Sequence, residues 1–202
     1  MLKAERLAAQ RGGVTLFANV GFALNPGEAL IVTGANGSGK TTLLRIVAGL
    51  TQPHSGQLSW QGVPVAAFDQ ARRSAALYIG HAAALKDEFT AEENLLSLVA
   101  LHDEPPDRKA MSDALDEWSL RSHAGIVARV LSQGQRRRVA LARMSLARRR
   151  LWVFDEPATA LDASGVAILE KRVNAHLAGQ GVAVIATHQR LALSGELRTL
   201  EL

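Results

Sequence analysis

The spacing of apolar and polar residues predicts that strands alternate with helices along this chain. From Leu16 to Leu24 every second side chain is apolar, which favours a strand. Apolar residues recur at helical spacing in Thr41–Leu50 and in Ala163–Ala178. We expect further strands at Ala29–Thr33, Leu77–Gly80, Leu151–Phe154 and Val182–Ala186. A last strand is expected at Glu196–Leu202.

Turns and a long helical stretch divide this pattern. Asn25–Gly27 and Pro53–Gly56 predict turns. From about Ala91 to Leu146 we expect mostly helix, interrupted by an exposed loop at Asp103–Asp107. The order of elements predicts an α/β fold in one domain, 1–202, with a core of about 1–81 and 148–202 and a helical subdomain of about 82–147.

Charge and composition narrow the classes of function. Lys and Arg number 23 and Asp and Glu 19, so the net charge of +4 permits an anionic partner without requiring one. The absence of cysteine excludes disulfides, thiolate metal sites and covalent haem attachment. No apolar run reaches the roughly 18–20 residues that cross a bilayer, and Met1–Arg6 does not resemble a secretory signal. We expect a soluble chain that reaches a membrane only through a partner.

A glycine-rich segment between a predicted strand and a predicted helix carries the strongest indication of chemistry. It matches the phosphate-binding pattern Gly-x-x-x-x-Gly-Lys-Ser/Thr in full. Glycines allow close approach of the backbone, and successive N–H groups form a nest for phosphate. We expect Lys40 to contact the β- and γ-phosphates, Thr41 to bind Mg²⁺ and Thr42 to lie near the α-phosphate. The ATP-binding residues expected here are Gly34, Ala35, Asn36, Gly37, Ser38, Gly39, Lys40, Thr41 and Thr42.

Two carboxylates follow the apolar run Leu151–Phe154. Asp155 and Glu156 therefore stand at the carboxyl end of a strand, where α/β sheets place ligands. We expect Asp155 to hold Mg²⁺ through water, and Glu156 to orient or deprotonate the water that attacks the γ-phosphate. Such a strand end alone is a weak indication of a site, and it gains weight from the phosphate-binding segment upstream.

A third segment, Leu131–Gln135, distinguishes among phosphate-binding proteins. Ser132 and Gly134 open a predicted helix and offer N–H groups to an anion. Here the chain resembles the ATP-binding subunits of ABC transporters, whose signature is Leu-Ser-Gly-Gly-Gln, although Gln133 replaces the first glycine. The resemblance implies a head-to-tail dimer in which Ser132, Gly134 and Gln135 contact the nucleotide bound by a second copy.

Two more segments follow in the order of that family. Ala160–Asp162 resembles the D-loop, which implies that Asp162 reaches across the dimer. Thr187–His188 resembles the switch segment, which implies that His188 bonds the γ-phosphate. The resemblance implies a P-loop ATPase of the ABC type, with a mixed α/β core, an antiparallel β region and a helical subdomain. Its expected cofactors are ATP and Mg²⁺, and its expected catalytic residues are Glu156, His188 and Lys40.

The chain departs from the family at two positions beside the nucleotide. Arg11 stands where the family has an aromatic residue that stacks on adenine. A guanidinium plane can stack on a base, so Arg11 is a candidate adenine contact. Alternatively, Phe17 contacts the adenine, and Arg11 is an ordinary surface arginine. His81 stands where the family has a glutamine that binds Mg²⁺. Neutral histidine can accept a hydrogen bond from metal-bound water, and a structural role in the loop is the alternative for His81.

Arginine runs at Arg136–Arg138 and Arg148–Arg150 raise the alternative of nucleic-acid binding. Aromatic residues make up only 4% of the chain and none lies within either run, so the stacking surfaces of nucleic-acid grooves are missing. We expect a solvated helix face at these runs and no nucleic-acid partner.

Several segments are similar to the ATPase subunits of cytochrome c maturation, also called haem exporters. They are Tyr78–His81, Leu85–Lys86, Leu131–Arg143, Leu151–Trp152 and Thr187–Gln189, with Ala82 in place of the usual glutamine. The similarity implies a peripheral subunit docked on a membrane permease at the cytoplasmic face of the bacterial inner membrane. ATP hydrolysis there would drive release of a haem-loaded chaperone. The histidines show no paired ligand spacing, so direct haem binding is not expected.

Two other classes of function are weighed against this one. A soluble ABC ATPase that acts on a scaffold, as in metal-cluster assembly, would share these motifs. Fused ATPase halves or long coiled-coil insertions would indicate other soluble classes, and the sequence has neither. A P-loop kinase would leave Leu131–Gln135 unexplained.

Overall fold

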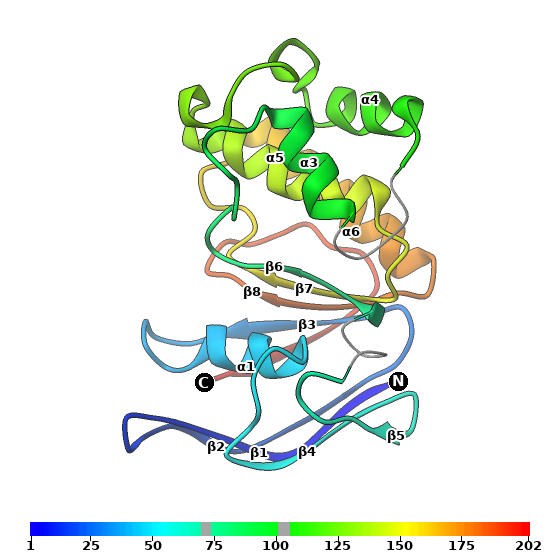
Figure 1. Cartoon of the computed structure of the whole chain (residues 1–202). Coiled ribbons are helices and arrows are strands. Elements are labelled where there is room, and N and C mark those ends of the chain that lie inside the picture. The colour runs from blue at the N-terminus through cyan, green and yellow to red at the C-terminus, as the bar shows by residue number, and fades with distance from the viewer. Residues whose placement is uncertain (70–73, 101–105) are drawn as a thin grey trace. The chain divides into compact units, whose positions relative to one another are not determined.

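The computed structural model describes residues 1–69, 74–100 and 106–202. Residues 103–105 of the predicted exposed loop lie outside the described residues. The chain divides into two compact units (Figure 1). The first unit comprises Met1–Tyr78, Arg149–Glu156 and Val173–Leu202, and the second comprises Ile79–Arg148 and Pro157–Arg172.

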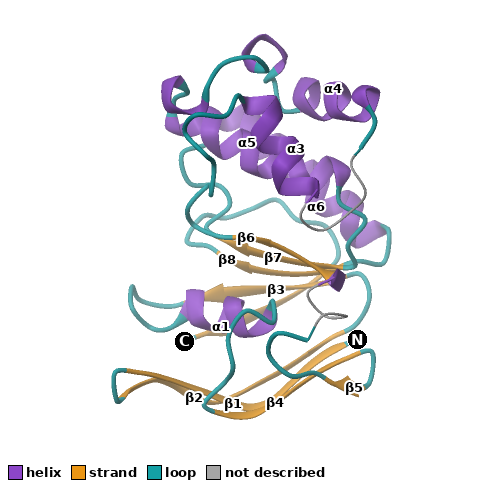
Figure 2. Ribbon diagram, in the orientation of Figure 1, coloured by secondary structure: helices purple, strands orange, loops and turns teal. Residues whose placement is uncertain are grey.

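Two β-sheets belong to the first unit. One is antiparallel, with the order β2–β1–β4–β5, and the other has the order β6–β7–β8–β3–β9, in which β7, β8, β3 and β9 run parallel (Figure 2). The strands are β1 (Leu2–Arg11), β2 (Val14–Leu24), β3 (Glu28–Thr33), β4 (Ser55–Trp60), β5 (Val63–Pro64), β6 (Ala76–Ile79), β7 (Leu151–Asp155), β8 (Val182–Ala186) and β9 (Glu196–Glu201).

One helix, α1 (Lys40–Val47), joins these sheets into a single core. Its buried side chains Leu43, Leu44, Ile46 and Val47 belong to the same hydrophobic cluster as residues of β1, β3, β7 and β8. Burial of this apolar surface is the main force that holds α1 in place. The loop before α1 follows β3 directly, and Thr41 of α1 bonds to Asp155 at the end of β7.

The second unit is helical. It contains α3 (Ala91–Ala100), α4 (Arg108–Glu117), α5 (Gln133–Leu146) and the first part of α6 (Ala163–Ala178), with short 3₁₀ turns at Arg121–His123 and Ala128–Val130. A partly buried polar network ties α4, α5 and α6 together. Trp118 Nε1 donates to Ser145 Oγ at 3.1 Å, Ser145 Oγ donates to Glu117 Oε2 at 2.6 Å, and Arg172 also donates to Glu117. Burial acts to raise the pKa of Glu117, but the bonds from Arg172 and Ser145 outweigh it and lower that pKa. In the described part of the chain, no helix combines the length and apolarity needed to cross a bilayer.

The predicted fold class is confirmed, and α6 and β8 have the predicted bounds. The helix predicted at Thr41–Leu50 ends earlier, at Val47. Gly49 adopts φ 77°, its N–H bonds to Ile46 O, and the Leu50 N–H bonds to Arg45 O. This pair of bonds is a Schellman cap, which terminates a helix.

Three strands lie where the sequence pattern did not predict them: β1, β4 and β5. Register shifts interrupt β1 and place Leu7, Ala8 and Ala9 all in the interior, so the two-residue alternation is lost. The turn predicted at Pro53–Gly56 is wrong in its second half, because Ser55 and Gly56 begin β4.

The prediction of a solvated face at Arg136–Arg138 is also wrong. Arg137 and Arg138 are only 4% and 8% exposed. Both guanidinium groups find carbonyl or carboxylate partners inside the second unit, and such partners permit a charge to be buried. Arg148 and Arg150 are exposed, but they lie beyond the end of α5.

Candidate functional site

The loop between β3 and α1 has the geometry of an anion cradle. Its last glycine, Gly39, precedes α1 at φ 104°, and no side chain caps the helix. The first N–H groups of such a helix carry partial positive charge and suit an anion. Lys40 Nζ donates to the carbonyls of Gly34 at 2.7 Å and Ala35 at 2.9 Å, so its charge lies over the loop.

Close packing beneath this loop requires glycine at two positions. A Cβ atom on Gly34 would stand 2.4 Å from Leu202 O, and one on Gly39 would stand 2.8 Å from Phe17 Cδ1. Gly37 instead faces open space at φ 85°. Ser38 Oγ is buried and has no hydrogen-bond partner among the described residues, which leaves a donor for a ligand in the loop.

Two predicted magnesium ligands meet in the first unit. Thr41 Oγ1 donates to Asp155 Oδ2 at 2.7 Å, although the two residues lie far apart in the sequence. Asp155 ends β7 and is 3% exposed. These are oxygen donors of the kind that Mg²⁺ prefers. Burial and the negative charge of Asp155 raise the pKa of the neighbouring Tyr78.

Glu156 and His188 also come together in the first unit. His188 Nε2 lies 3.6 Å from Glu156 Oε1, with the carboxylate side chain mostly buried and the imidazole half exposed. Glu156 follows β7 and adopts φ 48°, and its N–H donates to Ala186 O at 2.9 Å. This bond anchors the Glu156 backbone to the end of the neighbouring strand β8.

The segment Ser132–Gln135 lies in the second unit and begins α5. Ser132 Oγ accepts from the Gln135 N–H at 3.2 Å, and Gln135 Oε1 accepts from the Ser132 N–H at 2.8 Å. This reciprocal capping box fixes the start of the helix. A Cβ atom on Gly134 would stand 2.8 Å from Ala160 O, so the helix start lies directly against the Ala160–Asp162 segment.

Asp162 caps α6 and pairs with α5. Its Oδ1 accepts from the Gly165 N–H at 2.9 Å and from Arg138 Nη2 at 2.6 Å, and Ser164 adds a third bond. The Gly165 N–H, followed by Arg138, lowers the pKa of Asp162. Its predicted contact across a dimer stays a prediction.

His81 lines a hollow of about 260 Å³ in the second unit. Its neighbours there include Gln133, Arg136 and Thr159. Two departures from the family pattern, His81 and Gln133, therefore share one hollow. Because Thr41 and Asp155 belong to the first unit, the predicted contact of His81 with magnesium stays a prediction.

Arg11 and Phe17 have different surroundings. Phe17 is 7% exposed and its ring packs against Gly39 of the loop, while Arg11 is exposed at the end of β1. Which of the two contacts adenine stays a prediction.

Sequence reasoning missed Arg137 and Arg138. Arg137 bonds to the main chain of Gly80, His81 and Pro157, and Arg138 bonds to Asp162. Both stand next to predicted site residues. The run of three arginines drew attention to this helix, but their spacing gave no sign of burial.

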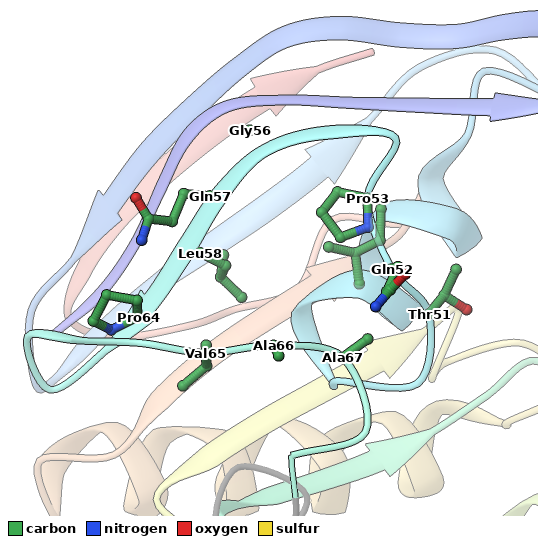
Figure 3. Close-up of a pocket in the computed structure, with 11 residues that line it drawn as sticks. Thr51, Gln52, Pro53, Gly56, Gln57, Leu58, Pro64, Val65, Ala66 and Ala67 are labelled. Carbon is green, nitrogen blue, oxygen red and sulfur yellow. The ribbon is translucent and has the colours of Figure 1, made fainter.

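A separate cavity of about 440 Å³ lies in the first unit (Figure 3). It is lined mainly by β4 and by the segments on either side of the β4–β5 hairpin. The residues in contact with it are Ile46, Thr51, Gln52, Pro53, Gly56, Gln57, Leu58, Pro64, Val65, Ala66 and Ala67. None of the predicted site residues lines it.

Comparisons with known proteins agree on one family. The sequence model described as ABC transporter matches residues 17–159. A protein of Pseudomonas putida named "Cytochrome c biogenesis ATP-binding export protein CcmA" is 49% identical over 190 residues, which cover 94% of this chain and 90% of that protein. The protein of the same name from Methylococcus capsulatus is 41% identical and covers 100% of this chain and 97% of its own.

Solved structures show the same fold. A dimeric bacterial ABC transporter cassette superposes with a TM-score of 0.83 at 25% identity, covering 100% of this chain and 94% of that one. A putative ABC transporter ATP-binding protein from Pyrococcus furiosus gives a TM-score of 0.84 at 22% identity, covering 98% and 96%.

Proposed function

This chain belongs to the ABC transporter family, and on that premise we propose that it is the ATP-hydrolysing subunit of a bacterial inner-membrane complex that serves cytochrome c biogenesis. The carrying observation is the meeting of the Gly34–Thr41 loop with the end of β7, where Thr41 bonds to Asp155. The names of relatives 41–49% identical over nearly the whole chain support the biological role. The chain acts as one ATP-binding domain, with a core of about 1–81 and 148–202 and a helical subdomain of about 82–147.

ATP binds with its phosphates in the loop of the first unit. The N–H groups of residues 34–42 and the hydroxyl of Ser38 take the phosphate oxygens, and Lys40 neutralises the β- and γ-phosphates. The uncapped start of α1 and the position of Lys40 over the loop support this assignment. Arg11 or Phe17 contacts adenine.

Thr41 and Asp155 would hold the magnesium ion of the nucleotide, and His81 would be a further contact. The short distance between the two oxygen atoms supports the fit, because a single small cation can be approached by both. When bound, Mg²⁺ neutralises charge on the phosphate oxygens.

Glu156 orients the attacking water and accepts its proton while the γ-phosphate leaves ADP. His188 bonds the γ-phosphate and holds the site closed. Their 3.6 Å separation supports joint action, since one water or phosphate oxygen can contact both side chains.

A second copy completes each site. Ser132, Gly134 and Gln135 of one copy contact the γ-phosphate held by the other, and Asp162 reaches across the head-to-tail dimer. The dimeric cassette among similar structures supports this arrangement. The capping box uses the N–H groups of Ser132 and Gln135, and it leaves those of Gln133 and Gly134 at the start of α5 for that phosphate.

Glu156→Gln tests the chemistry. The amide keeps the size of the side chain but accepts no proton, so turnover should fall by about 100-fold or more while ATP still binds. An ATP-held dimer should accumulate, as measured by size-exclusion chromatography with light scattering. Glu92→Gln, on the exposed face of α3, is the control and should hydrolyse ATP normally. Normal turnover in Glu156→Gln would refute the role of Glu156.

Deletion of the gene in its own bacterium tests the biological role. We expect loss of c-type cytochromes, measured by haem staining of membrane fractions. A plasmid copy should restore them and a Glu156→Gln copy should not. Normal cytochromes in the deletion strain would contradict the proposed role.

The subunit works at the cytoplasmic face of the inner membrane, docked on a permease, without contact with haem or nucleic acid. Affinity purification from detergent-solubilised membranes should recover an integral membrane protein. Recovery of soluble partners alone would contradict this docking.

A further inference from the structure

Arg137 is buried in the second unit and bonds to two other segments of that unit. Nε donates to Pro157 O at 3.1 Å, and Nη1 donates to Gly80 O at 2.7 Å and to His81 O at 3.2 Å. Bonds from a charged donor are stronger than neutral ones, and a buried charge that loses its partners is costly. The guanidinium therefore ties α5 firmly to both segments.

Both segments stand where the chain enters the second unit. The chain passes from the first unit to the second after Tyr78 and again after Glu156. Gly80 and His81 come shortly after the first passage, and Pro157 is the first residue after the second. One side chain thus fastens two passages, distant in sequence, to the same helix.

The second passage carries backbone strain. Glu156 adopts φ 48°, a left-handed conformation that residues other than glycine rarely take. The proline that follows restricts the backbone of Glu156 further. Such strain persists only where the surroundings fix the backbone. The bond from the Glu156 N–H to Ala186 O fixes one side, and the bond from Arg137 to Pro157 O fixes the other.

We propose that Arg137 is a positioning residue for Glu156, and that it couples the backbone of Glu156–Pro157 to that of Gly80–His81. The inference rests on the proposed role of Glu156 in hydrolysis. A small displacement of a catalytic carboxylate costs much of the rate. The bonds from Arg137 to Pro157, Gly80 and His81 lie outside the phosphate-binding loop, so its loss should lower kcat much more than it changes the KM for ATP.

Steady-state kinetics of the full chain test the positioning role. Arg137→Met keeps the apolar stem but has no donor. We expect kcat to fall about tenfold or more with the KM for ATP within about twofold. Arg137→Lys, which retains one charged donor, should recover part of the rate. Arg136→Met is the matched control, because Arg136 bonds elsewhere, to Asp87 and Ala128 O, and its kcat should not change.

Hydrogen exchange measured by mass spectrometry without nucleotide tests the coupling. In Arg137→Met, peptides covering 79–83 and 155–160 should both exchange about tenfold faster, while peptides covering 91–100 should not change. If Arg137→Met does not fold, Arg137→Lys should show the same paired loosening at smaller amplitude. An unchanged kcat in a folded variant, or loosening of only one segment, would overturn the inference. A wild-type chain without ATPase activity would refute the proposed function and leave the exchange result decisive for the coupling.

Discussion

At Gly39 the phosphate-binding loop lies directly on the ring of Phe17, and a Cβ atom there would also stand 3.1 Å from Leu16 Cβ. At Gly37 the backbone is again left-handed, but nothing lies within 4 Å of a Cβ atom. Glycine is therefore required at these two positions for different physical reasons. Gly37 is needed for backbone torsion alone, and Gly39 for torsion and for contact with the core.

Gly37→Ala and Gly39→Ala should differ in stability without nucleotide. A left-handed alanine costs about 1–2 kcal/mol at either position, and Gly39→Ala adds about 1–3 kcal/mol because Phe17 must move in a packed core. Thermal unfolding followed by circular dichroism should give a clearly lower Tm for Gly39→Ala. Equal Tm values for the two variants would contradict the close packing of Gly39.

At the scale of elements, α6 is fastened to β7 by a stacked pair of rings. His176 lies parallel to Trp152, with ring centroids 3.8 Å apart and an interplanar angle of 4°. His176 Nε2 lies 3.2 Å from Val182 O. Burial lowers the pKa of His176 from its ordinary 6.5 to about 4. The buried stack therefore favours the neutral form of the His176 imidazole.

Stability should therefore fall as the pH drops from about 6.5 to about 4. In that window the unfolded chain binds a proton at His176 and the folded chain does not, so the free energy of unfolding declines by up to about 3 kcal/mol. Above pH 6.5, titration of His176 no longer changes the free energy of unfolding. Urea denaturation of the wild type and of His176→Phe, which keeps a stacked ring without titrating, measures the difference. The same pH slope in both proteins would contradict this origin.

At the scale of the whole molecule, the motifs and the parallel strands could be predicted because their signals are local. Apolar runs such as Val182–Ala186 lie in interior strands and carry their pattern within a few residues. The bulged strand β1 could not be predicted, since its burial depends on pairing with β2 and β4.

Long-range partners explain the remaining errors. Nothing near Arg137 in the sequence announces that carbonyl groups from Gly80 and Pro157 will surround it. In contrast, the phosphate-binding segment, the carboxylates after β7 and the capped start of α5 are all encoded by neighbouring residues. Chemistry held in contiguous motifs could be inferred, and the side chains that position it could not.

The tryptophans are distributed between the two units in a way that allows the helical unit to be followed separately by fluorescence. Trp118 is the buried indole of the second unit, whereas Trp60 and Trp152 belong to the first. Replacing Trp60 and Trp152 by phenylalanine would leave an emission spectrum that reports on the helical unit alone. Fluorescence from such a single-tryptophan protein would follow the unfolding of the helical unit by itself.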